Sequence, residues 1–208
     1  MRYLGTTGVL AEKQAHAMML SAPRAPLQMQ ERADPNPGDG QIRVKVSACG
    51  VCRTDLHVVD AELPGIKYPV VPGHEIVGRV DLVGSRVTTH RIGDRVGIPW
   101  LGYTCGVCRF CKEGMVNLCD RPLFTGYTRD GGFATHTIAD ARYAFPLGED
   151  GDDVSIAPLL CAGLIGWRSL VMAGGGAARH LRLRCGRAHR GPDRALAGPV
   201  CLRLHAIR

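Results

Sequence analysis

Four cysteines constrain the fold of this chain more than any other feature of its sequence. They stand at the spacing C-x2-C-x2-C-x7-C, as Cys105, Cys108, Cys111 and Cys119. The short gaps let the backbone turn around a metal and the longer gap brings the last sulfur across, so four thiolates can meet at one tetrahedral ion. A ferredoxin-type iron–sulfur run is the competing interpretation, but it ends with a three-residue gap and a proline, whereas Asp120 follows Cys119 here. The spacing therefore predicts a closed structural zinc site.

The other cysteines and the apolar segments indicate a reducing, cytoplasmic setting. The chain of 208 residues contains nine cysteines and is 45% apolar, which excludes disorder of the whole chain. Residues 1–17 have a weak charge step and no apolar run of the length that a secretory signal needs. The longest apolar stretch, 156–173, is interrupted by Pro158 and Arg168 and is too short to cross a bilayer comfortably. We therefore expect a cytoplasmic protein without a membrane partner, whose thiolates are held by metal.

Short apolar bursts separated by proline and glycine turns predict a body made mainly of strands. The richest turn signal is the string PNPGDG at 35–40. One helix is expected over 153–172, because Asp152 and Asp153 suit the positive end of a helix dipole and Pro158 lies near its first turns. The expected strands are 17–20, 27–31, 41–46, 75–83, 95–98, 132–138 and 142–145.

A second group of chemically active residue types is spread over three strings. The first, CGVCRTDLH at 49–57, holds thiols, a cation, a hydroxyl, a carboxylate and an imidazole. The second, VPGHEIVG at 71–78, has a histidine beside an acid, and the third, PLLCAG at 158–163, has a lone cysteine. A catalytic zinc is held by three ligands with one position left open, and two cysteines with one histidine form one of the known sets. The three strings are therefore candidates for a catalytic zinc site.

In their order and spacing, the strings CGVCRTDLH, PGHEIVG, CGVCRFC with its later cysteine, and LLCAG resemble the zinc-dependent alcohol dehydrogenases of the medium-chain dehydrogenase/reductase superfamily. The resemblance covers about residues 18–172. It implies a mainly β fold with some α structure, namely a GroES-like, partly open β-barrel that carries a structural zinc lobe. It also implies a Rossmann domain that binds NAD or NADP, an active-site zinc between the two domains, a small alcohol or aldehyde substrate, and assembly as a homo-oligomer.

The resemblance assigns the catalytic zinc ligands and one cofactor contact. Cys52, rather than Cys49, matches the first ligand, because the family's ligand precedes the basic residue and the Ser or Thr. His74 matches the second ligand and Cys161 the third. Arg53 matches the position that touches the cofactor pyrophosphate, a role that suits its permanent charge and planar fork.

Four further side chains match catalytic positions of the family. Thr54 matches the hydroxyl that hydrogen-bonds the substrate oxygen, and His57 matches the far end of the proton relay. Asp55 and Glu75 match groups that orient the ligands or tune the metal. In such a site zinc acts as a Lewis acid on the alcohol oxygen. Trp100 is either a wall of the substrate pocket or an ordinary core aromatic.

The end of the sequence departs from the family pattern. The whole formal charge of +7 sits there, because 173–208 hold eight arginines and the single acid Asp193. A dehydrogenase should continue after Met172 into a strand, a G-x-G-x-x-G turn and a helix, but GGGAAR at 174–179 is not that turn. We therefore expect an N-terminal extension at 1–17, a GroES-like domain at 18–150, a helix at 151–172 that leads to a Rossmann domain missing here, and an out-of-frame, Arg-rich tail at 173–208.

A shift of the reading frame restores in the tail what the family should show there. If 182–186 are encoded by CGG CTT CGG TGC GGC, reading one nucleotide later gives Gly-Phe-Gly-Ala. With permitted codons through Arg208, the shifted frame can read IYGFGAAAHIVAQIARWQGRSVYAFTR, which is a strand end, a G-x-G-x-x-A turn, an amphipathic helix and a second strand. We infer a single-nucleotide slip near the codons of 174–176, and we do not expect hydride transfer by these 208 residues alone.

Two alternative functions rest on other features. In the first, the four-cysteine lobe makes the chain a zinc-binding structural or interaction module without catalysis. In the second, the eight tail arginines contact nucleic-acid phosphates. The tail has no Phe, Tyr or Trp for base stacking and no recognised binding motif, so no nucleic-acid partner is expected.

Sequencing the DNA through the codons of 174–176 tests the frame hypothesis. We expect the frame one nucleotide later to continue into a Rossmann domain and then into a C-terminal piece of the catalytic domain. A downstream frame that does not encode both of these parts would contradict it.

Overall fold

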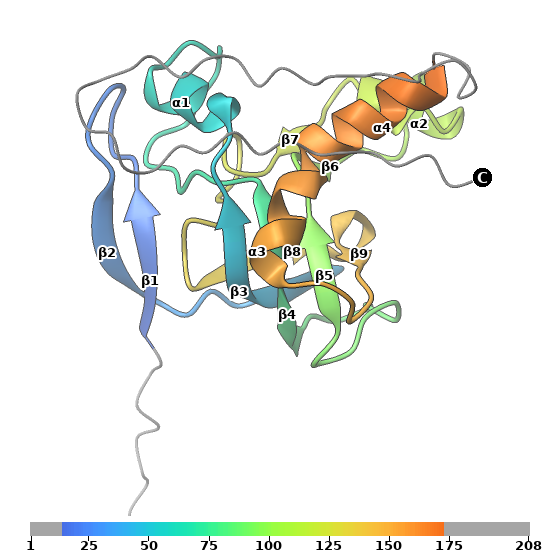
Figure 1. The fold of residues 1–208 in the computed structure, drawn as a ribbon, viewed down its shortest axis with the longest axis horizontal. Coiled ribbons are helices and arrows are strands. Elements are labelled where there is room, and N and C mark those ends of the chain that lie inside the picture. The colour runs from blue at the N-terminus through green and yellow to red at the C-terminus, as the bar shows by residue number, and fades with distance from the viewer. Residues whose placement is uncertain (1–13, 173–208) are drawn as a thin grey trace, which may run out of the picture. The chain divides into compact units, whose positions relative to one another are not determined.

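The structure is a computed structural model, and it describes residues 14–172 (Figure 1). The Arg-rich tail with its shifted frame, and most of the expected extension at 1–17, lie outside the described residues. The chain divides into two compact units between Ala162 and Gly163. The first unit contains every strand of the described residues and all three candidate ligands of the catalytic zinc, the last of which is Cys161. That unit is therefore the one that concerns function.

A five-stranded sheet forms the centre of the first unit. Its strand order is β8-β3-β4-β5-β9, and every pairing within it is antiparallel. The long strand β3 pairs with β4 on one side and β8 on the other, and two register shifts interrupt its pairing with β4. The strands are β3 (Gln41–Gly50), β4 (Glu75–Val83), β5 (Arg95–Ile98), β8 (His136–Asp140) and β9 (Phe145–Pro146).

Side-chain alternation along the strands builds the core against this sheet. Ile42 and Val44 on β3 are fully buried, whereas Lys45 between the strand's apolar positions is exposed. Successive side chains of a strand point to opposite faces, so Ile42 and Val44 share the core face. The cluster is completed by Ile76, Val80, Val96, Ile98, Ala139, Ala141 and Ala144.

Two small antiparallel sheets and several short helices complete the described residues. The small sheets are β1 (Gln14–Met19) with β2 (Gln28–Ala33) and β6 (Leu101–Tyr103) with β7 (Leu123–Phe124). The helices are α1 (Arg53–Val59), α2 (Arg109–Lys112), α3 (Asp153–Ile156) and α4 (Ala162–Met172), and the 3-10 turns are η1 (Val116–Leu118), η2 (Ala141–Tyr143) and η3 (Ala157–Leu160). The described fold is mainly β with some α structure, as the sequence predicts.

Most of the expected strands are present, and one is wrong. Strands 75–83 and 95–98 are confirmed with the same bounds, and four others correspond to β1, β2, β3 and β8 with shifted ends. The expectation for 142–145 is wrong over most of its length, because residues 141–143 form η2. The cause is Asp140, whose carboxylate accepts a hydrogen bond from the Arg142 N–H over 2.9 Å and so caps a tight turn.

The helix expected over 153–172 is also wrong, because the structure breaks it into α3, η3 and α4. Pro158 has no N–H for a continuous helix, and it stands in the first turn of η3. Cys161 then takes φ −126° and ψ −76°, outside the helical range. Cys161 therefore lies between two helical segments rather than on the face of one helix. A further helix, α1 at 53–59, was not predicted from the sequence.

Among residues 14–172, no single helix has the length and apolar composition needed to cross a membrane. The segments Asp153–Leu160 and Ala162–Met172 meet those requirements only together, as a bent pair.

Gly78 in β4 tests how closely the central strands pack. A Cβ added there would lie 2.3 Å from the Lys45 carbonyl oxygen and 2.7 Å from Val44 Cγ1, and the backbone oxygen cannot move aside cheaply. We expect Gly78→Ala to lower the free energy of unfolding by about 1–3 kcal/mol, the usual cost of overpacking. Urea denaturation measures this, with Gly148→Ala as the control because a Cβ there meets nothing within 4 Å. Equal effects of the two substitutions would contradict the packing argument.

Candidate metal centres

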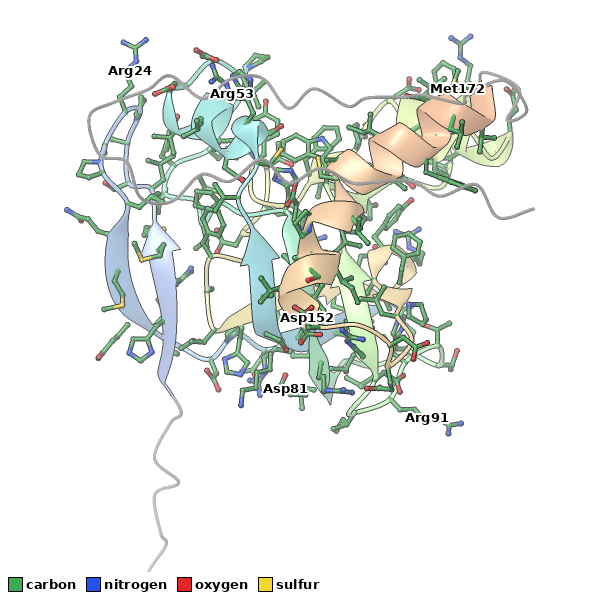
Figure 2. The ribbon with its side chains drawn as sticks, viewed as in Figure 1. Arg24, Arg53, Asp81, Arg91, Asp152 and Met172 are labelled. Carbon is green, nitrogen blue, oxygen red and sulfur yellow. The ribbon has the colours of Figure 1, made fainter. Side chains whose placement is uncertain are left out.

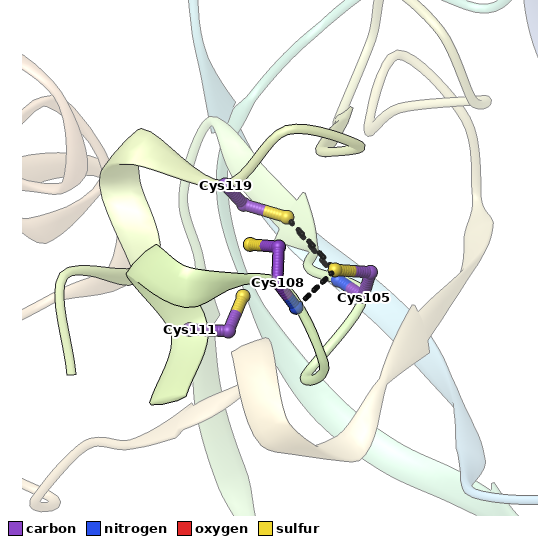
Figure 3. A group of neighbouring side chains, drawn as sticks. All are labelled: Cys105, Cys108, Cys111 and Cys119. Atoms are coloured by element: carbon purple, nitrogen blue, oxygen red, sulfur yellow. Dashed lines mark hydrogen bonds between the residues drawn. The ribbon is translucent and has the colours of Figure 1, made fainter. Parts of the chain in front are cut away.

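The four cysteines of the C-x2-C-x2-C-x7-C string meet around one point (Figure 3). Their Sγ atoms all lie within 4.8 Å of one another. Cys108 caps the start of α2, Cys111 lies within that helix, and Cys119 follows η1. Cys119 is buried and the other three, including Cys105, are half-buried. Short local elements therefore bring the four sulfurs together, as the spacing predicts.

Backbone N–H groups point at these sulfurs and favour their ionised form. The N–H of Cys105 donates to Sγ of Cys119 over 3.3 Å, and the N–H of Cys108 donates to Sγ of Cys105 over 3.4 Å. The N–H groups of Val107 and Cys108 lower the pKa of Cys105 to about 6, so its thiolate dominates at neutral pH. Burial raises the pKa of Cys111 to about 11, so a metal must displace its proton.

Zinc fits this donor set. Zn–S bonds of about 2.3 Å at tetrahedral angles place two sulfurs about 3.8 Å apart. Sγ of Cys105 and Sγ of Cys119 are 3.5 Å apart. Four thiolates leave no coordination position free, which is the arrangement of a structural zinc.

A second group brings together four side chains from distant parts of the sequence. The donor atoms of Cys52, His74, Glu75 and Cys161 lie within 4.8 Å of one another. Sγ of Cys52 and Sγ of Cys161 belong to residues 109 positions apart, yet they are separated by 3.8 Å. That separation also suits two sulfurs on one tetrahedral zinc. His74 and Glu75 are buried, with 1% and 3% exposure, and Cys52 and Cys161 are half-buried, so the group combines thiols, an imidazole and a carboxylate.

The carboxylate of Asp55 fixes two of these segments to each other. Its Oδ2 accepts the N–H of Cys52 over 2.7 Å, while its Oδ1 accepts the N–H of Gly73 over 3.2 Å and lies 3.1 Å from Nδ1 of His74. Asp55 is 3% exposed, so these contacts replace the water that the charge would otherwise need. With Nδ1 engaged by the carboxylate, Nε2 is the nitrogen of His74 left to bind a metal.

Glu75 lies among the donor atoms rather than behind them. The family resemblance gives Glu75 the role of a group that orients ligands or tunes the metal. The structure places one of its carboxylate oxygens in the same cluster as the sulfurs. Burial raises the pKa of Glu75. Gly50 leaves the space for it, because a Cβ at Gly50 would lie 2.0 Å from Oε2 of Glu75.

Cys49 is outside both groups of candidate ligands found in residues 14–172. Its Sγ packs against the backbone at Gly73 and Gly132, where an added Cβ would come within 2.8 Å and 2.9 Å of the sulfur. Burial raises the pKa of Cys49 to about 12, so this thiol stays protonated. The geometry favours Cys52 as the ligand from the first string.

The remaining predicted site residues lie along α1. Sγ of Cys52 and Oγ1 of Thr54 are 3.8 Å apart, so the hydroxyl adjoins the donor group. His57 lies further along the helix and is half-buried, and its Nδ1 contacts the carboxylate of Glu62. Arg53, at the first position of α1, is exposed (Figure 2) and is not brought into the metal group. Sequence reasoning missed Glu62, because it follows the end of α1 and helix spacing does not indicate it.

Trp100 adjoins the second group through His74. The two rings meet edge to face with centroids 5.0 Å apart. The indole also stacks on Phe124 at 5.1 Å and on Tyr127 at 5.6 Å. The sequence left open whether Trp100 is a pocket wall or a core aromatic, and these contacts place it in an aromatic stack beside a candidate ligand.

Residues 14–172 do not fit the NAD(P)-binding unit that the family resemblance implies. Every pairing between their named strands is antiparallel. A dinucleotide fold needs parallel strands joined by a crossover helix, with a glycine-rich turn at the helix start. The described part of the chain therefore contains candidate metal ligands but no dinucleotide fold.

Comparison with known proteins gives a match to the alcohol dehydrogenase GroES-like domain over residues 38–149. The "Probable alcohol dehydrogenase AdhA" of Mycobacterium tuberculosis is 48% identical over 151 residues, which are 70% of this chain and 44% of that protein. An alcohol dehydrogenase of Geobacillus stearothermophilus is 42% identical over 149 residues, again 44% of its length. The chain thus spans less than half of the curated relatives it matches.

Solved structures of dehydrogenases share the fold. A structure of CAD from Helicobacter pylori, complexed with NADP(H), superposes with a TM-score of 0.71 at 25% identity and covers 77% of this chain and 49% of that one. A cobalt- and zinc-bound thermostable alcohol dehydrogenase from Pyrobaculum aerophilum gives a TM-score of 0.71 at 28% identity over the same shares.

Asp55→Asn tests whether the carboxylate holds the second metal group together. The asparagine amide keeps one acceptor oxygen and replaces the other with an NH2 group. That NH2, a donor, would then face an N–H group whose hydrogen bond Asp55 accepts in the wild type. We expect metal affinity at Cys52, His74 and Cys161 to fall by about 10- to 100-fold, as for other groups that orient ligands. Competition with a chromophoric chelator measures this, and Asp60→Asn at the exposed end of α1 is the control. Unchanged affinity in Asp55→Asn would contradict the assignment.

Proposed function

The chain belongs to the zinc-dependent alcohol dehydrogenases of the medium-chain superfamily through its GroES-like domain, and on that premise we propose that it is the metal-binding part of such an enzyme. The overall reaction would be oxidation of an alcohol to an aldehyde or ketone with NAD(P). The observation that carries the proposal is that two separate donor groups form: Cys52, His74 and Cys161 meet in one, and four cysteines meet in the other.

The donor sets assign different tasks to the two metals. Cys52, His74 and Cys161 would provide the three protein ligands of a catalytic zinc, because two cysteines with one histidine form a known catalytic set. Glu75 lies in the same donor group, and we assign it as a neighbour of the metal rather than a fourth ligand, so that one position is left for a substrate oxygen. A zinc ion bound there supplies Lewis-acid polarisation of an alcohol or carbonyl oxygen. Asp55 holds His74 in the tautomer that ligates through Nε2. The four-cysteine group, with all its positions filled by thiolates, stabilises its own lobe.

Residues of α1 would handle the proton released from the alcohol. The Thr54 hydroxyl lies beside the Cys52 ligand, where it can accept that proton and pass it on. His57 is half-buried, so part of its ring reaches solvent and it can deliver the proton there. This relay is a proposal based on the family resemblance and on the position of both residues on one short helix.

Arg53 is the one residue of 14–172 to which we assign a contact with the NAD(P) cofactor. Arg53 is exposed at the start of α1 and carries a permanent charge, which suits a contact with a pyrophosphate. The Helicobacter pylori neighbour is a complex with NADP(H), but residues 14–172 of this chain lack a dinucleotide fold. No hydride-transfer step is therefore assigned to the described residues.

Metal analysis of the purified chain tests the proposal. We expect two zinc ions per chain, because two independent donor sets are present. Cys161→Ala and Cys111→Ala should each retain one ion, and Cys49→Ala, the control, should retain two. With Co²⁺ in place of zinc, a small alcohol should shift the visible absorption of the chain but not that of Cys161→Ala, since only the three-ligand site has an open position.

One zinc per chain, retained in Cys161→Ala and lost in Cys111→Ala, would instead favour a structural or interaction module without catalysis. A cobalt spectrum insensitive to alcohols would argue against the catalytic site in the same way.

A further inference from the structure

The third proposed ligand, Cys161, depends on a segment with little structure of its own. Residues 147–161 lead from β9 to this cysteine through an exposed, acidic loop, the single turn α3 and the 3-10 turn η3. The bond pattern around Cys161 is weak, because its N–H reaches only the Pro158 carbonyl over 3.4 Å. Something outside the segment must therefore determine where the thiol lies.

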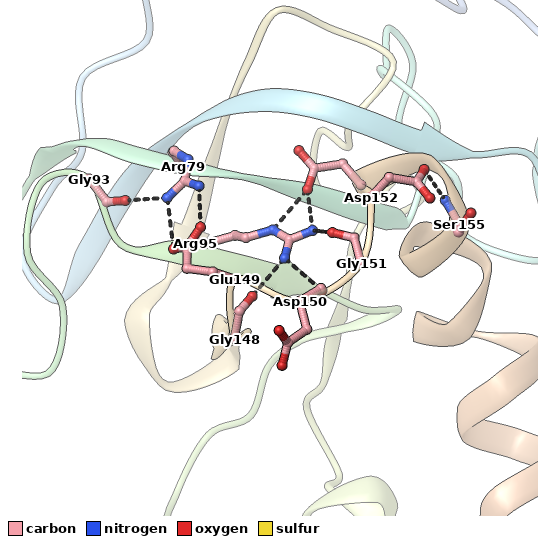
Figure 4. A network of polar contacts seen from close by, with 10 residues as sticks. Arg79, Gly93, Arg95, Gly148, Glu149, Asp150, Gly151, Asp152 and Ser155 are labelled. Carbon is pink, nitrogen blue, oxygen red and sulfur yellow. Dashed lines mark hydrogen bonds and ion pairs between the residues drawn. The ribbon is translucent and has the colours of Figure 1, made fainter.

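Arg95, the first residue of β5, supplies such an anchor (Figure 4). Its side chain is 4% exposed, and its guanidinium uses all five N–H donors on the segment. Nη1 donates to the carbonyls of Gly148 over 2.6 Å and Asp150 over 3.1 Å, and Nη2 donates to the carbonyl of Gly151 over 3.0 Å. Nε donates to Oδ1 of Asp153 over 2.8 Å, and Nη2 shares that oxygen. A buried positive charge is thus paired with one carboxylate and wrapped by three carbonyls.

The same face of β5 also receives the end of the segment. Alternation places Arg95 and Gly97 on one face, while Val96 and Ile98 belong to the core cluster on the other. A Cβ at Gly97 would lie 2.8 Å from Cδ2 of Leu160, so the leucine occupies the space that the glycine leaves. Leu160 immediately precedes Cys161. Two residues of β5 therefore hold the segment near its start and at the ligand.

We propose that Arg95 is a positioning residue for the catalytic metal site: by binding the loop at 148–153 it sets the path of the chain that delivers Cys161 to Cys52 and His74. This inference rests on the proposed function. Arginine is required because its planar fork reaches four groups at once, whereas a lysine keeps the charge with three donors at one point.

The test is Arg95→Lys in the full chain, with zinc affinity measured at both sites by chelator competition. We expect affinity at the Cys52, His74 and Cys161 site to fall by about 10- to 100-fold, as for other groups that orient ligands, and affinity at the four-cysteine site to stay unchanged. Mass-spectrometric mapping of thiol alkylation in the zinc-loaded chain should show faster labelling of Cys161 but not of Cys105. General loss of structure would expose both.

Arg79→Gln is the matched control. Arg79 lies on the neighbouring strand β4 and pairs with Glu149 of the same loop over 2.6 Å, but its side chain is 50% exposed. It should leave both zinc affinities unchanged. If Arg95→Lys does not fold, Asp153→Asn decides, because it removes the carboxylate partner of Arg95 and should cause the same selective loss to a smaller degree.

Wild-type affinity at both sites in folded Arg95→Lys, or an equal fall at both, would overturn the inference. If Arg95→Lys does not fold, wild-type zinc affinity at both sites in Asp153→Asn would overturn it as well. A wild-type chain that binds only one zinc would defeat the proposed function itself, which separates the two failures.

Discussion

The three hydrogen bonds around Asp55 are the interaction on which the rest of the site depends. A carboxylate that is 3% exposed is costly unless its lone pairs are used, and here the donors are the N–H groups of Cys52 and Gly73 and the ring of His74. These donors belong to the start of α1 and to the turn before β4. The charge therefore joins two segments that would otherwise approach each other as separate loops, and it sets the orientation of one proposed ligand.

The two metal centres illustrate two ways of building a site. The four-cysteine group is local: its members fall within Cys105–Cys119, and short helical turns present the sulfurs to one another. The second group is assembled across the sheet, with Cys52 after β3, His74 before β4 and Cys161 beyond β9. A local site requires only its own lobe, whereas the assembled site requires the register of the sheet and the anchors on β5.

That difference explains which predictions held. The strand bounds of β4 and β5 and the existence of the four-cysteine group followed from apolar runs and spacing, which act over a few residues. The unbroken helix over 153–172 was wrong because Pro158 and the backbone at Cys161 break it. The contact between His57 and Glu62 was missed because the glutamate lies past the helix end. In both cases the periodic pattern does not record the deciding feature, which is the missing N–H of a proline in one and a contact past the helix end in the other.

By itself the sequence determined the chemistry available to this protein: which thiols, imidazoles and carboxylates exist, and that four of them are spaced for one zinc. The family resemblance already favoured Cys52 over Cys49, but only the tertiary structure shows that Cys52 faces Cys161 while the thiol of Cys49 is packed against the backbone of Gly73 and Gly132. The tertiary structure also decided that Glu75 joins the donor atoms. The physical reason is range: spacing controls distances over a few residues, but a separation of 109 residues is closed only by strand pairing and by buried charges that hold the segments in place.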